Sequence, residues 1–241
     1  PADAKVEIDG QPVKCDKGIV AAVALGVAIA SGRVSVTPLQ MAVGYTTFAN
    51  GGFRIAPYFI ERIEDEKGNV LEQAQPIRVT ENAKQVIDPR NAFLMTSMMQ
   101  DVVERGTATR AKQLSRTDLA GKTGTTNDHV DAWFCGYQVN LVAVAWIGFD
   151  NPRSLGNNET GGRAALPIWM NYMGKVLQSV PMAVYAPPTG VTMARINPAT
   201  GLREAHGAMT EYFLQEQLPP EAGRDDDDVA KPSGDVPDRL L

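Results

Sequence analysis

Residues 121–126 read G-K-T-G-T-T, and their side chains could bind an anion and assist proton transfer. Lys122 supplies a cation, Thr123 and Thr125 supply hydroxyl donors, and Gly124 lets a substrate backbone approach closely. A lysine in this setting holds a phosphate when it ends a glycine-rich loop before a helix. It holds a carboxylate when it lies on a strand that borders a cleft and aligns an extended substrate.

The neighbouring sequence excludes the phosphate site. A phosphate-binding P-loop needs a glycine five residues before its G-K-T, where this chain has Arg116. It also needs an apolar strand before the loop and a helix after it, because the helix N-terminus holds the phosphates. Here residues 115–118 are polar, and the pattern after Gly121 is that of a strand. We therefore expect Lys122 to lie on a strand and to face a carboxylate.

Two helices are predicted ahead of this strand. Thr37 and Gln40 form a capping box for the first helix, which stops at residues 50–52, Asn-Gly-Gly. The second helix begins at an Asp88 cap and runs to Arg105 with one broad apolar face. Between the two helices, apolar runs on either side of a charged turn predict a short hairpin at residues 57–63 and 70–71.

The pattern after the motif predicts an antiparallel sheet. Residues 123–126, 132–138 and 141–149 form three extended runs separated by turn residues, which indicates a meander. The third run is apolar on both alternating faces, so we expect it in the middle of a sheet covered on both sides. Residues 163–180 have helical spacing and are a candidate cover for one face. The predicted fold class is α+β, an antiparallel sheet with helices on both faces.

Composition excludes several other functions. The net charge is −5 and no basic patch appears, so no nucleic-acid partner is expected. The longest apolar run, residues 19–30, is too short to cross a bilayer. The residues that most often bind transition metals are few and have no familiar metal-binding spacing: Cys15, Cys135, His129 and His206. We expect no metal site. Two cysteines neither establish nor exclude a disulfide, and Cys135 fits a small buried thiol in a strand.

Several further segments occur in a fixed order around the G-K-T-G-T-T stretch. They are T-P-L-Q-M-A (37–42), T-F-A-N-G-G (47–52), G-T-A (106–108), D-A-W-F-C-G-Y (131–137), G-G-R-A-A-L-P-I-W (161–169), P-P-T-G-V (187–191) and I-N-P-A-T-G-L (196–202). The series closely resembles the transpeptidase domain of class A, bifunctional penicillin-binding proteins, over about residues 21–215. It departs from the family before Thr37, where the preceding link looks longer than usual.

The resemblance implies the serine β-lactamase/DD-peptidase (transpeptidase-like) fold, of which residues 1–222 would be the C-terminal portion. Residues 223–241, with six Asp against three Lys or Arg, read as an acidic, solvated tail. The family acylates a serine in an S-x-x-K motif, but none of the seven serines here is followed by lysine at the third position. The nucleophile is therefore unknown and expected on upstream polypeptide of the same protein. Residues 1–241 alone are expected to be inactive.

By the same resemblance, the complete protein would cross-link peptidoglycan stem peptides that end in D-Ala-D-Ala, and it would bind β-lactams. It would lie at the periplasmic face of the bacterial inner membrane, with an N-terminal anchor and a glycosyltransferase domain ahead of this one. Lys122, Thr123 and Thr125 would bind the terminal carboxylate and move the proton. The Thr125 N–H would complete the oxyanion hole, Gly124 would serve by being small, and Asn127 would lie at the cleft rim.

Two alternatives stay open at the level of sequence. The chain could come from a D,D-carboxypeptidase or a β-lactamase, in which water resolves the acyl-enzyme. It could instead be a non-catalytic module that binds wall peptide, which a complete chain without S-x-x-K would have to be. Asp131 and Trp133 are expected to be ordinary structural features of the sheet.

Overall fold

The computed structural model describes residues 7–8, 11–12, 36–79, 81–206 and 209–223. They fall into two compact units, one within residues 1–189 and the other within residues 190–241. The predicted tail begins at residue 223, and all but its first residue lie outside the described part, as does Cys15. The division of the chain at residue 222 stays a prediction. No helix in the described segments is long and apolar enough to span a bilayer.

The first described helix, α2 (Pro38–Ala49), confirms the predicted capping box. The Gln40 N–H donates to Thr37 Oγ1 over 3.2 Å, and the Thr37 N–H donates to Gln40 Oε1 over 2.8 Å. At the other end, the Asn50 side chain both donates to and accepts from the Phe53 backbone. The helix therefore stops where its sequence predicts. Near the N-terminus, β1 (Glu7–Ile8) pairs with β2 (Gln11–Pro12).

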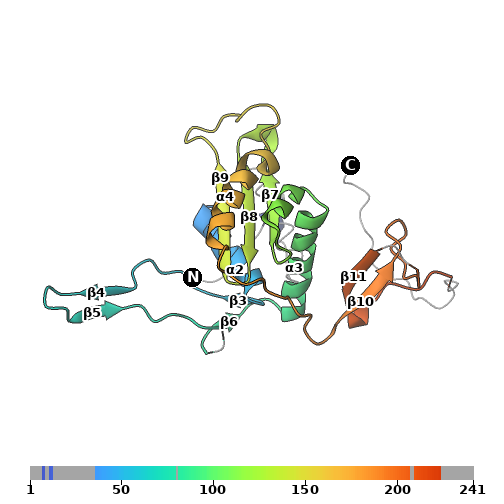
Figure 1. Cartoon of the computed structure of the whole chain (residues 1–241), viewed down its shortest axis with the longest axis horizontal. Helices are drawn as coiled ribbons and strands as arrows, with labels where there is room; N and C mark the ends of the chain where they lie inside the picture. The colour runs from blue at the N-terminus through green and yellow to red at the C-terminus, as the bar shows by residue number, and fades with distance from the viewer. Residues whose placement is uncertain (1–6, 9–10, 13–35, 80, 207–208, 224–241) are drawn as a thin grey trace. The chain divides into compact units, whose positions relative to one another are not determined.

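A long β arm separates α2 from α3 (Pro89–Glu104), whose predicted Asp88 cap accepts from the Arg90 N–H over 2.8 Å. The arm is closed at its base by β3 (Phe53–Arg54) and β6 (Lys84–Gln85), which pair antiparallel. Its outer part is the hairpin of β4 (Arg62–Glu64) and β5 (Val70–Gln73), which projects away from the sheet in Figure 1. The predicted hairpin is confirmed, although its first strand is shorter than expected.

The sheet is the predicted antiparallel meander of β7 (Ala120–Thr125), β8 (Ala132–Gln138) and β9 (Leu141–Ile147), in the order β7-β8-β9. The prediction that the third run is the middle strand is wrong for the sheet formed by the described residues, because β8 lies in its middle and all seven residues of β8 are buried. Helices α2 and α4 both contact β9. Cover on both faces explains why β9 is apolar on both sides although it lies at an edge of the described sheet.

Helices pack on both faces of the sheet, as predicted. Side chains alternate along β8, so Phe134 and Tyr137 face opposite sides. Phe134 packs on Trp169 of α4 (Leu166–Val176), with ring centroids 4.8 Å apart. Tyr137 packs with residues of α2 and α3, and its hydroxyl lies 2.8 Å from that of Thr96. The predicted helix at 163–180 opens as one π-helical turn, η3 (Gly161–Ala165), and α4 ends at Val176.

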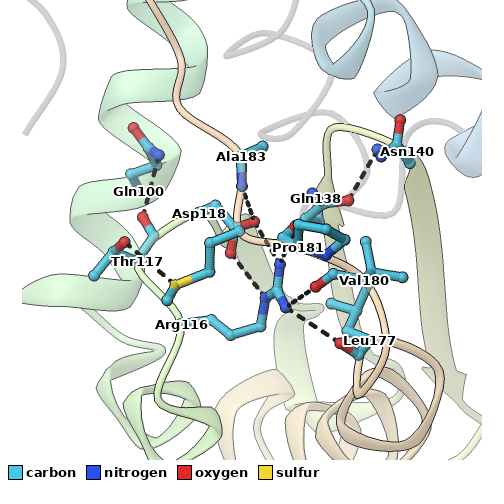
Figure 2. A network of polar contacts seen from close by, with 11 residues as sticks. Gln100, Arg116, Thr117, Asp118, Gln138, Asn140, Leu177, Val180, Pro181 and Ala183 are labelled. Atoms are coloured by element: carbon cyan, nitrogen blue, oxygen red, sulfur yellow. Dashed lines mark hydrogen bonds and ion pairs between the residues drawn. The ribbon is translucent and has the colours of Figure 1, made fainter.

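An ion pair fastens the end of α4 to the segment that leads into β7 (Figure 2). Arg116 and Asp118 form two hydrogen bonds of 2.9 and 2.7 Å, and their side chains are 11% and 0% exposed. The Arg116 guanidinium also donates to three carbonyl oxygens beyond α4, those of Leu177, Val180 and Pro181. Asp118 accepts a further bond, of 2.9 Å, from the Ala183 N–H. The pair therefore ties residues 177–183 to the start of β7.

The second unit is built on one antiparallel pair, β10 (Val191–Ile196) and β11 (Met209–Leu214), followed by the turn η4 (Gln215–Gln217). The Arg203 side chain donates to the Pro219 carbonyl over 2.6 Å and forms an ion pair with Glu221. These contacts close the segment after β11 back onto the unit. The two remaining short helices lie in the first unit: η1 (Thr109–Leu114) and η2 (Asn127–His129).

Candidate functional site

Strand β7 carries all but the last residue of the G-K-T-G-T-T stretch and lies at an edge of the described sheet. The Thr126 N–H donates to the Asp131 carbonyl across to β8 over 3.1 Å. Because hydrogen-bonded pairs alternate along an antiparallel ladder, the N–H groups of Thr123 and Thr125 then point away from β8. The outer edge of β7 therefore offers main-chain groups to an extended ligand.

Lys122 lies on the face of β7 opposite to Thr123 and Thr125, because side chains alternate along a strand. Its Nζ donates to the Thr123 carbonyl over 2.8 Å and lies 3.5 Å from Thr123 Oγ1. Partial burial of the ammonium lowers the pKa of Lys122 from its ordinary value, because the charged form loses water. Among the described residues, Lys122 forms no ion pair with a carboxylate, so its charge is available to an anionic ligand.

The hydroxyl of Thr123 is paired with that of Thr107, 16 residues earlier, at 2.7 Å. Thr107 follows α3 in an exposed turn just before η1. Its motif, G-T-A, contributed to the family resemblance, but nothing in its spacing assigned it a role. Only the fold brings the two hydroxyls together.

Thr125 is held by the start of the π-helical turn. Its Oγ1 accepts a hydrogen bond of 3.0 Å from the Gly161 N–H. A Cβ atom on Gly161 would lie 2.2 Å from the Trp133 carbonyl oxygen and 2.5 Å from that of Gly124. Only glycine allows the chain to approach β7 and β8 this closely. Gly161 begins the G-G-R-A-A-L-P-I-W segment, which contributed to the family resemblance. As with Thr107, the sequence alone assigned this residue no role.

Asn127 lies in η2, the exposed turn that follows β7. The next two residues, Asp128 and His129, have left-handed backbones with φ of 57° and 54°. Such backbones are costly for residues other than glycine and persist only where neighbouring contacts fix them. Here the Asp131 N–H donates to Thr126 Oγ1 over 2.7 Å. The structure places Asn127 just past the end of β7, where the sequence predicts a turn, and beyond the cluster of Lys122 and the threonines. Its place at the rim of a cleft stays a prediction.

The residues interpreted as structural have structural partners. Asp131 Oδ1 accepts from Trp146 Nε1 over 2.8 Å, and the rings of Trp133 and Trp146 lie 5.8 Å apart. Cys135 is a free thiol, 3% exposed, and burial raises its pKa to about 12. A thiol in this state is a poor nucleophile at neutral pH.

The described residues contain neither a metal site nor an evident nucleophile. No group of three or more His, Cys, Asp or Glu side chains in this part of the chain is arranged to hold a metal ion. The four described serines form no hydrogen bond with a lysine or histidine side chain; they are Ser97, Ser115, Ser154 and Ser179. The site thus consists of one cation, three hydroxyls and the outward main chain of β7, which suits binding of a carboxylate.

Known proteins match this chain over most of its length. The family model described as the penicillin binding protein transpeptidase domain matches residues 3–173. Penicillin-binding protein 1A of Pseudomonas aeruginosa is 42% identical over 240 residues, covering 80% of this chain and 29% of that protein. Penicillin-binding protein 1A of Neisseria flavescens is 48% identical over 163 residues, covering 68% of this chain and 20% of that protein.

A solved structure agrees with these matches. The crystal structure of penicillin-binding protein 1A from Haemophilus influenzae superposes with a TM-score of 0.72 at 35% identity, covering 78% of this chain and 33% of that one. This chain therefore spans about a third or less of the length of each of these relatives. The predicted transpeptidase-like fold is confirmed. On the family match and the identity to these relatives, the chain belongs to the penicillin-binding protein transpeptidase domain family.

Proposed function

We propose that this chain is the part of a peptidoglycan D,D-transpeptidase that binds the donor peptide and completes its oxyanion hole. One observation carries the proposal: the outer edge of β7 combines threonine hydroxyls, outward N–H groups and an ammonium that has no carboxylate partner among the described residues, all within six residues. A stem peptide ending in D-Ala-D-Ala is extended, and it ends in the carboxylate that such a set recognises.

The donor peptide would lie along β7 as an added strand. Lys122 would attract the terminal carboxylate, and Thr123 and Thr125 would donate hydroxyl hydrogen bonds to it. The Thr125 N–H would stabilise the oxyanion that forms when a serine attacks the peptide carbonyl. That serine would come from upstream polypeptide of the same protein. A stem-peptide amine would then resolve the acyl-enzyme, and Asn127 would border the cleft.

The lowered pKa of Lys122 supports a role in proton movement. A lysine with a lower pKa releases and regains its proton more readily near neutral pH than an ordinary lysine. In this proposal the group binds the carboxylate when charged and exchanges a proton with the reacting groups. No metal or organic cofactor takes part.

The remaining proposals concern the complete protein and rest on the family resemblance. It would lie at the periplasmic face of the inner membrane, held by an N-terminal anchor. It would carry a glycosyltransferase domain ahead of the transpeptidase domain. The likeness to proteins called penicillin-binding protein 1A, which are several times longer than this chain, supports this arrangement.

The test is the rate at which the full-length protein is acylated by a fluorescent penicillin. Lys122→Ala should lower the second-order rate about 10- to 100-fold, because hydrogen bonds to charged groups contribute about 1.5–3 kcal/mol. Lys175→Ala, which removes an exposed lysine near the end of α4, is the matched control and should leave the rate unchanged. Equal rates for the two variants would remove Lys122 from the site.

A second pair of variants tests Thr125. Thr125→Val should slow acylation, but it also deprives the Gly161 N–H of its acceptor, so a loss of stability of about 1–3 kcal/mol is expected. Thr125→Ser keeps the hydroxyl and should retain both rate and stability.

The reaction products distinguish the enzyme classes: a transpeptidase forms cross-linked dimers from donor and acceptor stem peptides. A D,D-carboxypeptidase only trims the donor, and a β-lactamase turns over penicillin.

A further inference from the structure

The pair of hydroxyls formed by Thr107 and Thr123 has a consequence for ligand binding. Each threonine hydroxyl has one proton to donate and two lone pairs to accept with. A single hydrogen bond of 2.7 Å joins the two oxygens, and either can be its donor. If Thr123 donates to Thr107, it keeps no proton for a ligand. If Thr107 donates, the proton of Thr123 stays free.

Lys122 is compatible with the second arrangement, because its ammonium needs only one of the two lone pairs of Thr123 Oγ1. Its ammonium has donors only, and it lies 3.5 Å from Thr123 Oγ1. With Lys122 on one lone pair and the Thr107 proton on the other, Thr123 Oγ1 is filled as an acceptor. Its own proton must then point elsewhere, toward any anion at the edge of β7. An approaching carboxylate stabilises the same arrangement, because it can only accept.

We propose that Thr107 is a positioning residue: it donates its hydroxyl proton to Thr123, which keeps the Thr123 proton for the terminal carboxylate of the donor peptide or penicillin. This inference rests on the proposed function of β7. Thr107 acts through Thr123 and need not touch the ligand.

The backbone of Thr107 is fixed from several sides, as a positioning role requires. Ala108 is 0% exposed, and its N–H donates to the Val102 carbonyl over 3.0 Å. A Cβ on Gly106 would lie 2.8 Å from the Val102 Cα, and one on Gly162 would lie 3.1 Å from the Thr107 carbonyl oxygen. The end of α3 and the π-helical turn η3 therefore hold the Thr107 hydroxyl against β7.

The test uses the full-length protein with two penicillins, the free acid and its methyl ester, in which the carboxylate is masked. Thr107→Val keeps the side-chain shape but removes the proton. It should slow acylation by the free acid roughly 2- to 10-fold, the range expected for the loss of one hydrogen bond between neutral groups. Acylation by the ester, which lacks the carboxylate that Thr123 would bind, should change less than twofold. Thr107→Ser restores the donor and should restore the rate with the free acid.

A double-mutant cycle shows whether Thr107 acts through Thr123. In a Thr123→Val background, Thr107→Val should have no further effect on the rate with the free acid. Equal slowing of the acid and the ester by Thr107→Val would show a merely structural role and overturn the inference, as would an unchanged rate with the acid. If Lys122→Ala also leaves the rate unchanged, the proposed function fails as well. If Lys122→Ala slows acylation while Thr107→Val does not, only this inference fails.

Discussion

Removing Arg116 should destabilise the transpeptidase domain more than any change to a surface ion pair. The partner carboxylate, Asp118, is 0% exposed and receives two of its hydrogen bonds from Arg116. In an Arg116→Met variant, that carboxylate stays buried and loses both guanidinium hydrogen bonds while it keeps the one from the Ala183 N–H, and three carbonyl groups beyond α4 lose their guanidinium. Breaking a buried ion pair in this way typically costs about 3–5 kcal/mol.

The two partners should not be equivalent. Asp118→Asn leaves a neutral amide that still accepts from Ala183, and Arg116 keeps its bonds to the three carbonyls. We expect a cost of about 1–3 kcal/mol, typical of weakened buried hydrogen bonds. Replacing both residues, in Arg116→Met/Asp118→Leu, removes the unpaired charge and should recover part of the stability lost in Arg116→Met.

Thermal unfolding of the full-length protein measures these differences through the transition of the transpeptidase domain. At about 2–4 °C per kcal/mol for a domain of this size, Arg116→Met should lower Tm by roughly 6–20 °C. Arg62→Met is the matched control, since Arg62 and Glu64 pair on the exposed arm with side chains 52% and 38% exposed. Such pairs contribute about 0–1 kcal/mol. Equal shifts for Arg116→Met and Arg62→Met, or a double variant less stable than Arg116→Met, would refute this reasoning.

Two further predictions concern the effect of low pH on stability and the tight packing of Gly161, at the start of η3, against β7 and β8. Burial acts to raise the pKa of Asp118, but hydrogen bonds from Arg116 and Ala183, with the Arg116 charge, outweigh it and leave the pKa below its ordinary value. The ionised Asp118 carboxylate therefore stabilises the folded domain fully above its unfolded pKa of about 3.9, and this stabilisation is lost as pH falls through the lower pKa of the folded state. Between pH 5 and pH 2, Tm should consequently fall more steeply in the wild type than in Asp118→Asn. Gly161→Ala should lower both Tm and the acylation rate, by about 1–3 kcal/mol in stability, because its Cβ has no space. Gly44→Ala, in α2 with nothing within 4 Å, should be neutral or slightly stabilising; similar losses in both would contradict the steric explanation.

Helix starts could be predicted from neighbouring residues, whereas the order of the strands could not, because it depends on segments that are far apart in sequence. The Thr37 capping box and the Asp88 cap depend on residues within one turn, so sequence alone located both helix starts. Strand order depends on which segments meet. β8 ends in Gln138, a polar residue that is nonetheless 0% exposed, whereas the more apolar β9 lies at an edge of the sheet that the described residues form. Burial on the faces and position in the sheet are separate properties, and the apolar pattern reports only the first.

The candidate site also combines residues that the sequence places together with residues that only the fold brings together. Lys122, Thr123 and Thr125 are adjacent in sequence, and the strand alone fixes their spacing. The supports of that strand, Thr107 and Gly161, come from segments 16 and 36 residues away from the threonines they contact. No local pattern relates such distant residues, so their roles became visible only with the fold.

Because its two ends are paired at β3 and β6, the arm between them can change in length without moving the helices on either side. Its two ends meet in the pairs Phe53 with Gln85 and Arg54 with Lys84, and the Gly52 carbonyl accepts from both of the residues that follow β6. The chain therefore leaves α2 and returns toward α3 through one closed base. Doubling the length of such a closed segment costs only about 0.6 kcal/mol in loop entropy. Evolution or an engineer can lengthen, shorten or insert a tag into the exposed turn around Gly68 while α2, α3 and the candidate site keep their positions.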